Sequence, residues 1–130
     1  MGYPQGFVQI HPDKIEWRSI PEMPSMEFAI LLGDPQEEGP LLVRYKLPPD
    51  IQIAPHTHSD ARTYTVLFGE WRLGFGEIFD AEALITFGPG SAYRLPAEVA
   101  HYQAAGPDGA VIQIESIGPT TNEFVELGNR

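Results

Sequence analysis

Three histidines carry the strongest chemical signal in the sequence. His56 and His58 stand two residues apart at the end of a strand-like run from Ile51 to Ala54. Residues i and i+2 of a strand point to the same face, so both imidazoles are expected to lie side by side and to reach one ion. His101 follows a glycine turn and a proline-containing turn, and it can supply a third ligand from elsewhere in the sheet. The pattern predicts a site of neutral imidazoles, which are ligands of Zn, Fe, Ni and Cu.

The alternative is that these histidines are ordinary polar residues near strand ends, in a protein that has no ion. If all three do bind a metal, they leave coordination positions open, and an open position distinguishes a catalytic or ligand-binding site from a closed structural one. The fourth histidine, His11, precedes Pro12 and is expected to be a surface residue.

The two histidine motifs resemble those of the cupin superfamily. The first cupin motif combines a glycine, a His-x-His pair, a glutamate and a second glycine, and the second combines a glycine, Pro-x-Gly and a histidine. The matching residues are His56, His58 and Gly69 for the first motif, and Gly90, Pro96 and His101 for the second. The resemblance covers residues 41 to 117. It implies an all-β fold, a jelly-roll (double-stranded β-helix) barrel whose site lies inside one mouth.

The sequence departs from the cupin pattern at three positions. Asp50 stands where the leading glycine would be, Glu98 replaces the glycine of Pro-x-Gly, and Arg62 occupies the position of the glutamate ligand. An arginine beside a divalent ion needs an anion between them, since like unit charges ~4 Å apart repel by about 4 kcal/mol at an effective dielectric of 20. Arg62 therefore turns away from the ion or faces a carboxylate, which is either that of Glu115 or that of a substrate. We prefer bidentate capture of a substrate carboxylate by Arg62.

Strand alternation selects the other candidate site residues. Arg62 shares a face with Tyr64, Val66 and Phe68, so it is expected to point into the barrel, and Arg62 and Tyr64 are the candidate catalytic side chains. Gln103 has the parity of His101 and is also expected to point inward. The candidate substrate-binding residues are Arg62, Gln103, Gln113 and Glu115. Such polar residues, like Tyr93 and Tyr102, serve equally well as hydrogen-bonded members of a core.

The spacing of 13 prolines and 13 glycines predicts many short strands and no long helix. Expected strands are Phe7–Ile10, Met26–Leu32, Pro40–Leu47, Thr63–Phe68, Trp71–Phe75, Ile85–Phe87, Ser91–Leu95, Val99–Ala104 and Ala110–Ile117, besides the run that carries His56. Gly69 and Glu70 are expected to form a hairpin turn, and Asp80 to cap a helical turn. Phe68, Phe75, Phe87 and Trp71 are expected in the core.

Composition limits the classes of function. The 130 residues suit one domain, with an N-terminal arm over residues 1–25, and no stretch approaches the ~20 apolar residues of a membrane span. The N-terminus does not resemble a secretory signal, so we expect a cytoplasmic protein. A formal charge of −10 argues against nucleic acid and membranes as partners. Without cysteine, a metal must be held by nitrogen and oxygen.

These observations predict a metal-dependent cupin-type enzyme that acts on a small organic acid, with a dioxygenase, an isomerase and a lyase all open. The cofactor is expected to be a divalent Fe, Mn, Ni or Zn ion on His56, His58 and His101. The alternative is a non-catalytic ligand-binding or sensory cupin, which zinc or an empty site would favour. Ile51 and Ile53 have the opposite parity to the two histidines, so we expect them to face outward and to be covered by the N-terminal arm or by the second subunit of a homodimer.

Overall fold

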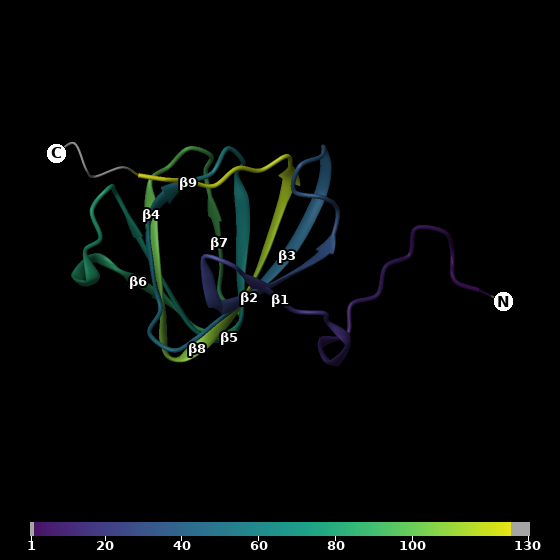
Figure 1. Ribbon diagram of the computed structural model, residues 1–130, viewed down its shortest axis with the longest axis horizontal. Coiled ribbons are helices and arrows are strands. Elements are labelled where there is room, and N and C mark those ends of the chain that lie inside the picture. Colours follow the sequence, from purple (N-terminus) through teal and green to yellow (C-terminus); the bar gives the residue numbers. More distant parts are fainter. Residues whose placement is uncertain (1, 126–130) are drawn as a thin grey trace.

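The computed structural model describes residues 2–125, and the regular structure in this part of the chain is almost entirely β-strand (Figure 1). The strands are β1 (Arg18–Ile20), β2 (Met23–Leu32), β3 (Gly39–Leu47), β4 (Gln52–Thr57), β5 (Arg62–Phe75), β6 (Ile85–Phe87), β7 (Ala92–Leu95), β8 (His101–Gly118) and β9 (Glu123–Phe124). They form one hydrogen-bonded sheet that curls into a barrel. The prediction of an all-β barrel is confirmed. No helix of residues 2–125 is long and apolar enough to cross a membrane.

Two long strands organise the sheet. β5 pairs with β8 in antiparallel register along nearly its whole length, from Arg62 opposite Ser116 to Phe75 opposite His101. β8 also pairs with β3 and β4, so it joins both sides of the barrel. His101, the first residue of β8, therefore lies between His56 of β4 and Phe75 of β5.

The hairpin expected at Gly69 and Glu70 is wrong, because β5 runs through these residues as a single bent strand. Gly69 has a φ of +75°, and a Cβ there would overlap the carbonyl oxygen of Gly109 on β8. The β5–β8 register shifts between Gly69 and Trp71. A glycine with positive φ at a register shift bends a strand without reversing it.

Side chains of the long strands fill the interior, but not all the predicted ones. Tyr64, Val66 and Trp71 are buried to 2% exposure or less. Phe68, expected on the same face as Tyr64, is 56% exposed, because the register of β5 shifts between Val66 and Phe68 and so inverts the alternation. Phe75, at the end of β5, is 52% exposed, so its expected place in the core is also wrong.

Most other expected elements are present. β2, β3, β6 and β7 lie where strands were predicted, and Asp80 caps the 3-10 turn η2 (Ala81–Ala83) by accepting a hydrogen bond from the backbone of Glu82 at 3.0 Å. The strand expected at Phe7–Ile10 is wrong. Those residues form no strand, and Figure 1 shows the N-terminal segment extending away from the barrel, beyond the 3-10 turn η1 (Pro12–Lys14).

A bulge in β4 changes which side chains face inward. Ile53 is opposite Gln103, whereas His56 is opposite His101, so the register shifts by one residue between them. Ile53 therefore lines the same cavity as His56, and Ile51 packs against the core. The expectation that both isoleucines face outward is wrong, because a β-bulge restarts the alternation.

Candidate metal centre

The sheet brings the three predicted histidines together. His56 lies near the end of β4, His58 directly follows that strand, and His101 begins β8 beside it. Their ring centroids are 4.2 to 5.1 Å apart, and one ring nitrogen from each lies within 4.8 Å of the other two. All three side chains are buried. This spacing allows one ion to contact all three rings.

Backbone carbonyls orient all three rings in the same way. The Nδ1 atom of His56 lies 2.7 Å from the carbonyl oxygen of Ala54, and that of His101 lies 2.9 Å from Val99. The Nδ1 atom of His58 lies 3.0 Å from the carbonyl of Thr121. A carbonyl only accepts hydrogen bonds, so each Nδ1 must carry the proton and each Nε2 a free lone pair. Metal-binding histidines are commonly oriented in this way.

The Nε2 atoms of His58 and His101 are buried and have no hydrogen-bond partner among the described residues. A buried polar atom left without a partner is unusual and points to an unseen ligand. A divalent ion with imidazole ligands fits these unpartnered lone pairs.

Burial also favours the neutral form that binds metals. It lowers the pKa of His56 to about 4 and that of His58 to about 3, with the nearby charge of Arg62 contributing further at His58. Burial likewise lowers the pKa of His101. All three imidazoles are therefore neutral at pH 7, and no proton has to leave when an ion binds.

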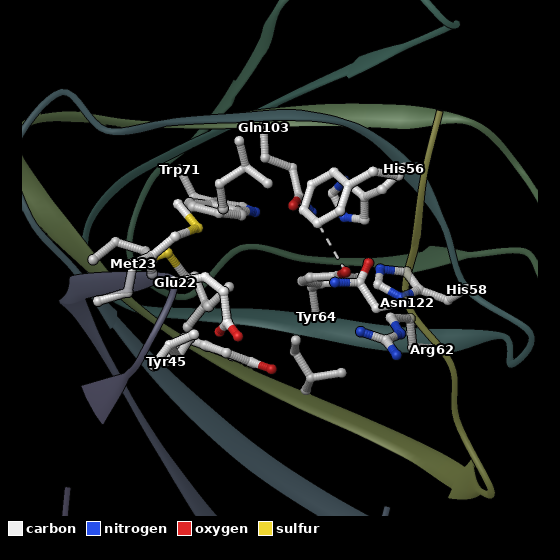
Figure 2. Close-up of a pocket in the computed structure, with 17 residues that line it drawn as sticks. Glu22, Met23, Tyr45, His56, His58, Arg62, Tyr64, Trp71, Gln103 and Asn122 are labelled. Carbon is white, nitrogen blue, oxygen red and sulfur yellow. Dashed lines mark hydrogen bonds between the residues drawn. The ribbon is translucent and has the colours of Figure 1, made fainter. Parts of the chain in front are cut away.

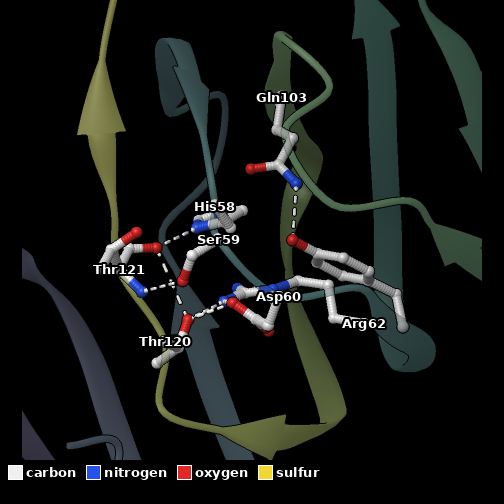
Figure 3. A network of polar contacts seen from close by, with 8 residues as sticks. His58, Ser59, Asp60, Arg62, Gln103, Thr120 and Thr121 are labelled. Carbon is white, nitrogen blue, oxygen red and sulfur yellow. Dashed lines mark hydrogen bonds and ion pairs between the residues drawn. The ribbon is translucent and has the colours of Figure 1, made fainter.

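Arg62 points inward, as its parity predicted, but its partner is Asp60 and not Glu115 (Figure 3). The Arg62 Nε atom donates to Asp60 Oδ2 at 3.2 Å and Nη2 donates to Asp60 Oδ1 at 3.1 Å. Nη2 also donates to the Thr120 hydroxyl at 2.7 Å, and this hydroxyl in turn donates to Asp60. Glu115 is exposed on the outer face because its neighbour Ile114 points inward. The alternative in which Arg62 pairs with Glu115 is therefore wrong.

The surroundings of Asp60 favour its ionised form. Burial alone would raise the pKa of Asp60, but the hydrogen bonds from Arg62 and Thr120 outweigh burial and lower it. The Arg62 guanidinium and the Asp60 carboxylate thus neutralise each other next to the histidines. Asp60 was not among the predicted site residues, although an acidic residue two positions before Arg62 was a usable signal.

Residues 119–125 form a segment that crosses the mouth of the barrel, which we call the C-terminal strap. Its Thr121 accepts from His58 through the carbonyl oxygen and donates from the backbone N–H to Ser59 Oγ at 3.1 Å. Within the strap, β9 pairs with β4, and the Phe124 ring lies 5.5 Å from that of His56. The sequence contained no signal for this segment, because its contacts join residues about sixty positions apart.

A cavity of about 330 Å³ opens beside the histidines. In Figure 2, His56, His58, Arg62 and Asn122 gather at one end, and Trp71 and Met23 lie at the other. The volume lies within the usual range for small-molecule sites. The cavity also includes Glu22, Asn122 and Phe124, which sequence reasoning did not single out.

Two of the other predicted site residues line this cavity and one does not. Gln103 donates to the Tyr64 hydroxyl at 3.4 Å, and both lie beside the histidine end. Gln113 instead accepts from Arg44 Nε at 2.8 Å and does not line the cavity. The candidate substrate-binding role of Gln113 is not supported by this position. The pairing of β8 with β5 shifts between Ala105 and Ala110, so the inward residues beyond this shift are Ile112 and Ile114.

The two remaining candidate tyrosines are hydrogen-bonded outside the cavity lining. Tyr93 accepts from Trp71 Nε1 at 2.9 Å and stacks on Tyr64 with ring centroids 4.6 Å apart. Tyr102 donates to the carbonyl oxygen of Asp80 at 3.1 Å. Both therefore support the walls of the barrel.

Solved structures with the same fold are numerous, although no family model and no curated protein sequence matches the chain. The polyketide cyclase RemF from Streptomyces resistomycificus is 19% identical, with a TM-score of 0.76 over 94% of this chain and 87% of its own. A putative acetylacetone dioxygenase from Methylibium petroleiphilum is 17% identical, with a TM-score of 0.70 over 100% and 88%. An RmlC-like cupin from Shewanella frigidimarina is 14% identical, with a TM-score of 0.65 over 83% and 87%. The chain therefore has the cupin fold.

Proposed function

We propose that this chain, which has the cupin fold, is a metal-dependent enzyme that acts on a small organic molecule. The observation that carries the proposal is the arrangement of His56, His58 and His101, whose Nδ1 atoms are held by carbonyls and whose Nε2 atoms converge. The similarity to a polyketide cyclase and to a putative dioxygenase supports an enzyme but does not select its reaction. A dioxygenase, an isomerase and a lyase all stay open.

The three histidines would hold a divalent Fe, Mn, Ni or Zn ion. When bound, such an ion supplies a Lewis acid with open positions for a substrate oxygen or water. The protein around it supplies a wall that excludes bulk water and holds each ring in one tautomer.

Tyr64 is the proposed hydrogen-bond donor beside this centre. Burial raises the pKa of its phenol, so the hydroxyl stays protonated at neutral pH. Because Gln103 donates to its oxygen, the Tyr64 proton is free to hydrogen-bond a substrate oxygen. Gln103 would hold Tyr64 in place and contact the same substrate.

Arg62 has a different role from the one expected from the sequence. Its Nε atom donates to Asp60, and its Nη2 atom donates to both Asp60 and Thr120. A guanidinium holds a carboxylate with two hydrogen bonds only along an edge that includes Nε or Nη2, and the N–H groups of both atoms are occupied here. Bidentate capture of a substrate carboxylate is therefore blocked while this network is intact. We propose an organic acid as substrate with its anionic oxygen at the histidine centre, and Arg62 as a wall residue beside it that Asp60 and Thr120 hold in place.

A non-catalytic ligand-binding or sensory protein is the second candidate. It is favoured by Arg62 itself, which replaces the anionic ligand of the cupin motif and so removes a group that would help to hold the ion. In that case the cavity binds a small molecule without turning it over.

Metal titration combined with a turnover assay tests the proposal. Chelator-treated protein is titrated with Zn(II), Mn(II), Ni(II) and Fe(II), and we expect one ion per chain. His101→Gln should weaken binding by more than about 100-fold, whereas His11→Gln, at an exposed residue, should not. Metal-loaded protein is then incubated with small organic acids, and products are sought by mass spectrometry.

The outcomes separate the two candidates. Turnover that requires the ion and is lost in His101→Gln supports the enzyme, whereas saturable binding without products supports the binding protein. Metal uptake that His101→Gln leaves unchanged contradicts the site itself. The cytoplasmic location is a separate prediction, which cell fractionation would test.

A further inference from the structure

The charge around the histidine centre limits what can bind there. Among the described residues, the group able to hold an ion consists of the three histidines without a carboxylate. Asp60 and Arg62 neutralise each other. Imidazole ligands bring no negative charge, so an anionic ligand would offset the charge of a divalent ion. A chelating pair of oxygens, at least one of them anionic, is such a ligand.

The opposite end of the cavity carries Met23 and Trp71, with the exposed Glu22 close to Met23 (Figure 2). Other apolar residues of the lining are Met26, Leu47 and Ile112. The indole N–H of Trp71 is already bound to Tyr93, so Trp71 presents no free donor to a ligand. In Figure 2, Trp71 and Met23 lie on the side away from His56 and His58. A small hydrophilic acid would leave this end of the cavity unfilled.

Aromatic rings form much of the wall between the two ends. Tyr45, Tyr64 and Trp71 line the cavity, and aromatic faces pack well against flat ring systems. Tyr64 and Gln103 stand next to the histidines, where a ligand's oxygens would lie. The wall therefore suits a planar body whose oxygen donors lie at the histidine end.

We propose that the site takes a flat, apolar molecule that carries two adjacent oxygen donors at one end, such as a cyclic hydroxy-ketone. The oxygens bind at the histidine end, beside Tyr64 and Gln103, and the ring body fills the end formed by Met23 and Trp71. This inference rests on the proposed function, because it requires an ion on the histidines.

Two ligands with the same chelating head test the inference on wild-type protein. 3-Hydroxy-4-pyranone has the head alone, and 3-hydroxychromone adds a fused benzene ring. Both are titrated calorimetrically into Zn(II)-loaded protein. Burial of the added ring should make 3-hydroxychromone bind about tenfold more tightly.

Two variants test whether the ring of the ligand lies at the end of the cavity formed by Met23 and Trp71. Met23→Glu places a charge at that end and should remove the advantage of 3-hydroxychromone, with binding of 3-hydroxy-4-pyranone retained. Ile78→Glu makes the same kind of change at a residue that is 69% exposed and outside the cavity lining, and should keep the advantage.

Equal affinity of the two ligands for wild-type protein overturns the inference, as does an advantage that survives in Met23→Glu. Failure of both ligands to bind the Zn(II)-loaded protein also overturns it. The wild-type comparison decides the question even if Met23→Glu does not fold. Failure of the protein to take up Zn(II) would instead show, in the preceding metal titration, that the proposed function is wrong.

Discussion

At the scale of single residues, the buried charges of Arg62 and Asp60 stabilise each other. Arg62 is 7% exposed and Asp60 is 8% exposed, so removing one partner leaves the other as a buried, uncompensated charge. We expect Arg62→Gln to lower the free energy of unfolding by about 3 kcal/mol. Urea denaturation would measure this loss.

Two controls accompany this prediction. Arg94→Gln removes an exposed arginine and should change stability by less than about 0.5 kcal/mol. The double variant Asp60→Asn/Arg62→Gln should recover part of the loss, because no lone charge is left. If Arg62→Gln is as stable as Arg94→Gln, the pair is not buried as described.

The histidines predict how the metal-free protein responds to acid. The pKa is about 4 for His56 and about 3 for His58, against an ordinary value of 6.5. Below pH 6.5 the unfolded chain binds protons that the native state does not, so the free energy of unfolding falls as pH falls toward 4. Each of these histidines should cost about 2 kcal/mol of stability between pH 7 and 5.

Denaturation of chelator-treated protein at pH 7, 6 and 5 checks this response. His56→Gln/His58→Gln should show a flatter dependence, since most carboxylates titrate below this range. A wild-type curve as flat as that of the variant would contradict the burial of these rings.

At the scale of elements, the C-terminal strap ties the mouth of the barrel to the histidines. The Thr120 hydroxyl bonds to Asp60 and Arg62, and the carbonyl of the next residue, Thr121, accepts from His58. Thr120→Val keeps the size of the side chain but removes the hydroxyl. We expect it to loosen the strap and to lower metal affinity by about tenfold.

Thr120→Ser restores the hydroxyl and should restore metal affinity. The measurement is competitive metal titration, together with the nitrogen chemical shifts of His58, which report whether its Nδ1 still carries the proton. Unchanged affinity and unchanged shifts in Thr120→Val would show that the strap does not position His58.

At the scale of the whole molecule, we predict a homodimer. The reason is no longer Ile51 and Ile53, which are partly buried within the barrel. It is the N-terminal segment, where Tyr3 and Phe7 are 76% and 55% exposed and which extends away from its own barrel (Figure 1). A second subunit would cover these apolar side chains.

Sedimentation at micromolar concentration tests the prediction. Tyr3→Ser/Phe7→Ser should shift the chain from dimer toward monomer, whereas Ile78→Ser, at another exposed apolar residue, should not. A wild-type monomer under these conditions would contradict the dimer.

Local patterns in the sequence were sufficient to predict the barrel and the three histidines. His56 and His58 alternate on one short segment, turn residues mark most of the strands, and the spacing to His101 belongs to a recognisable motif. Strand alternation and turn chemistry depend on neighbouring residues, so a sequence displays them directly.

The tertiary structure decided which way other side chains face and which partners they have. Alternation cannot be carried past the bulge before His56, the register shift after Val66 or the register shift of β8 between Ala105 and Ala110. The predictions for Ile53, Phe68 and Gln113 failed at these points. The partnership of Arg62 with Thr120, and of His58 with Thr121, joins positions about sixty residues apart. Such contacts exist only once β4, β5 and the C-terminal strap are packed together, because no local rule brings them into register.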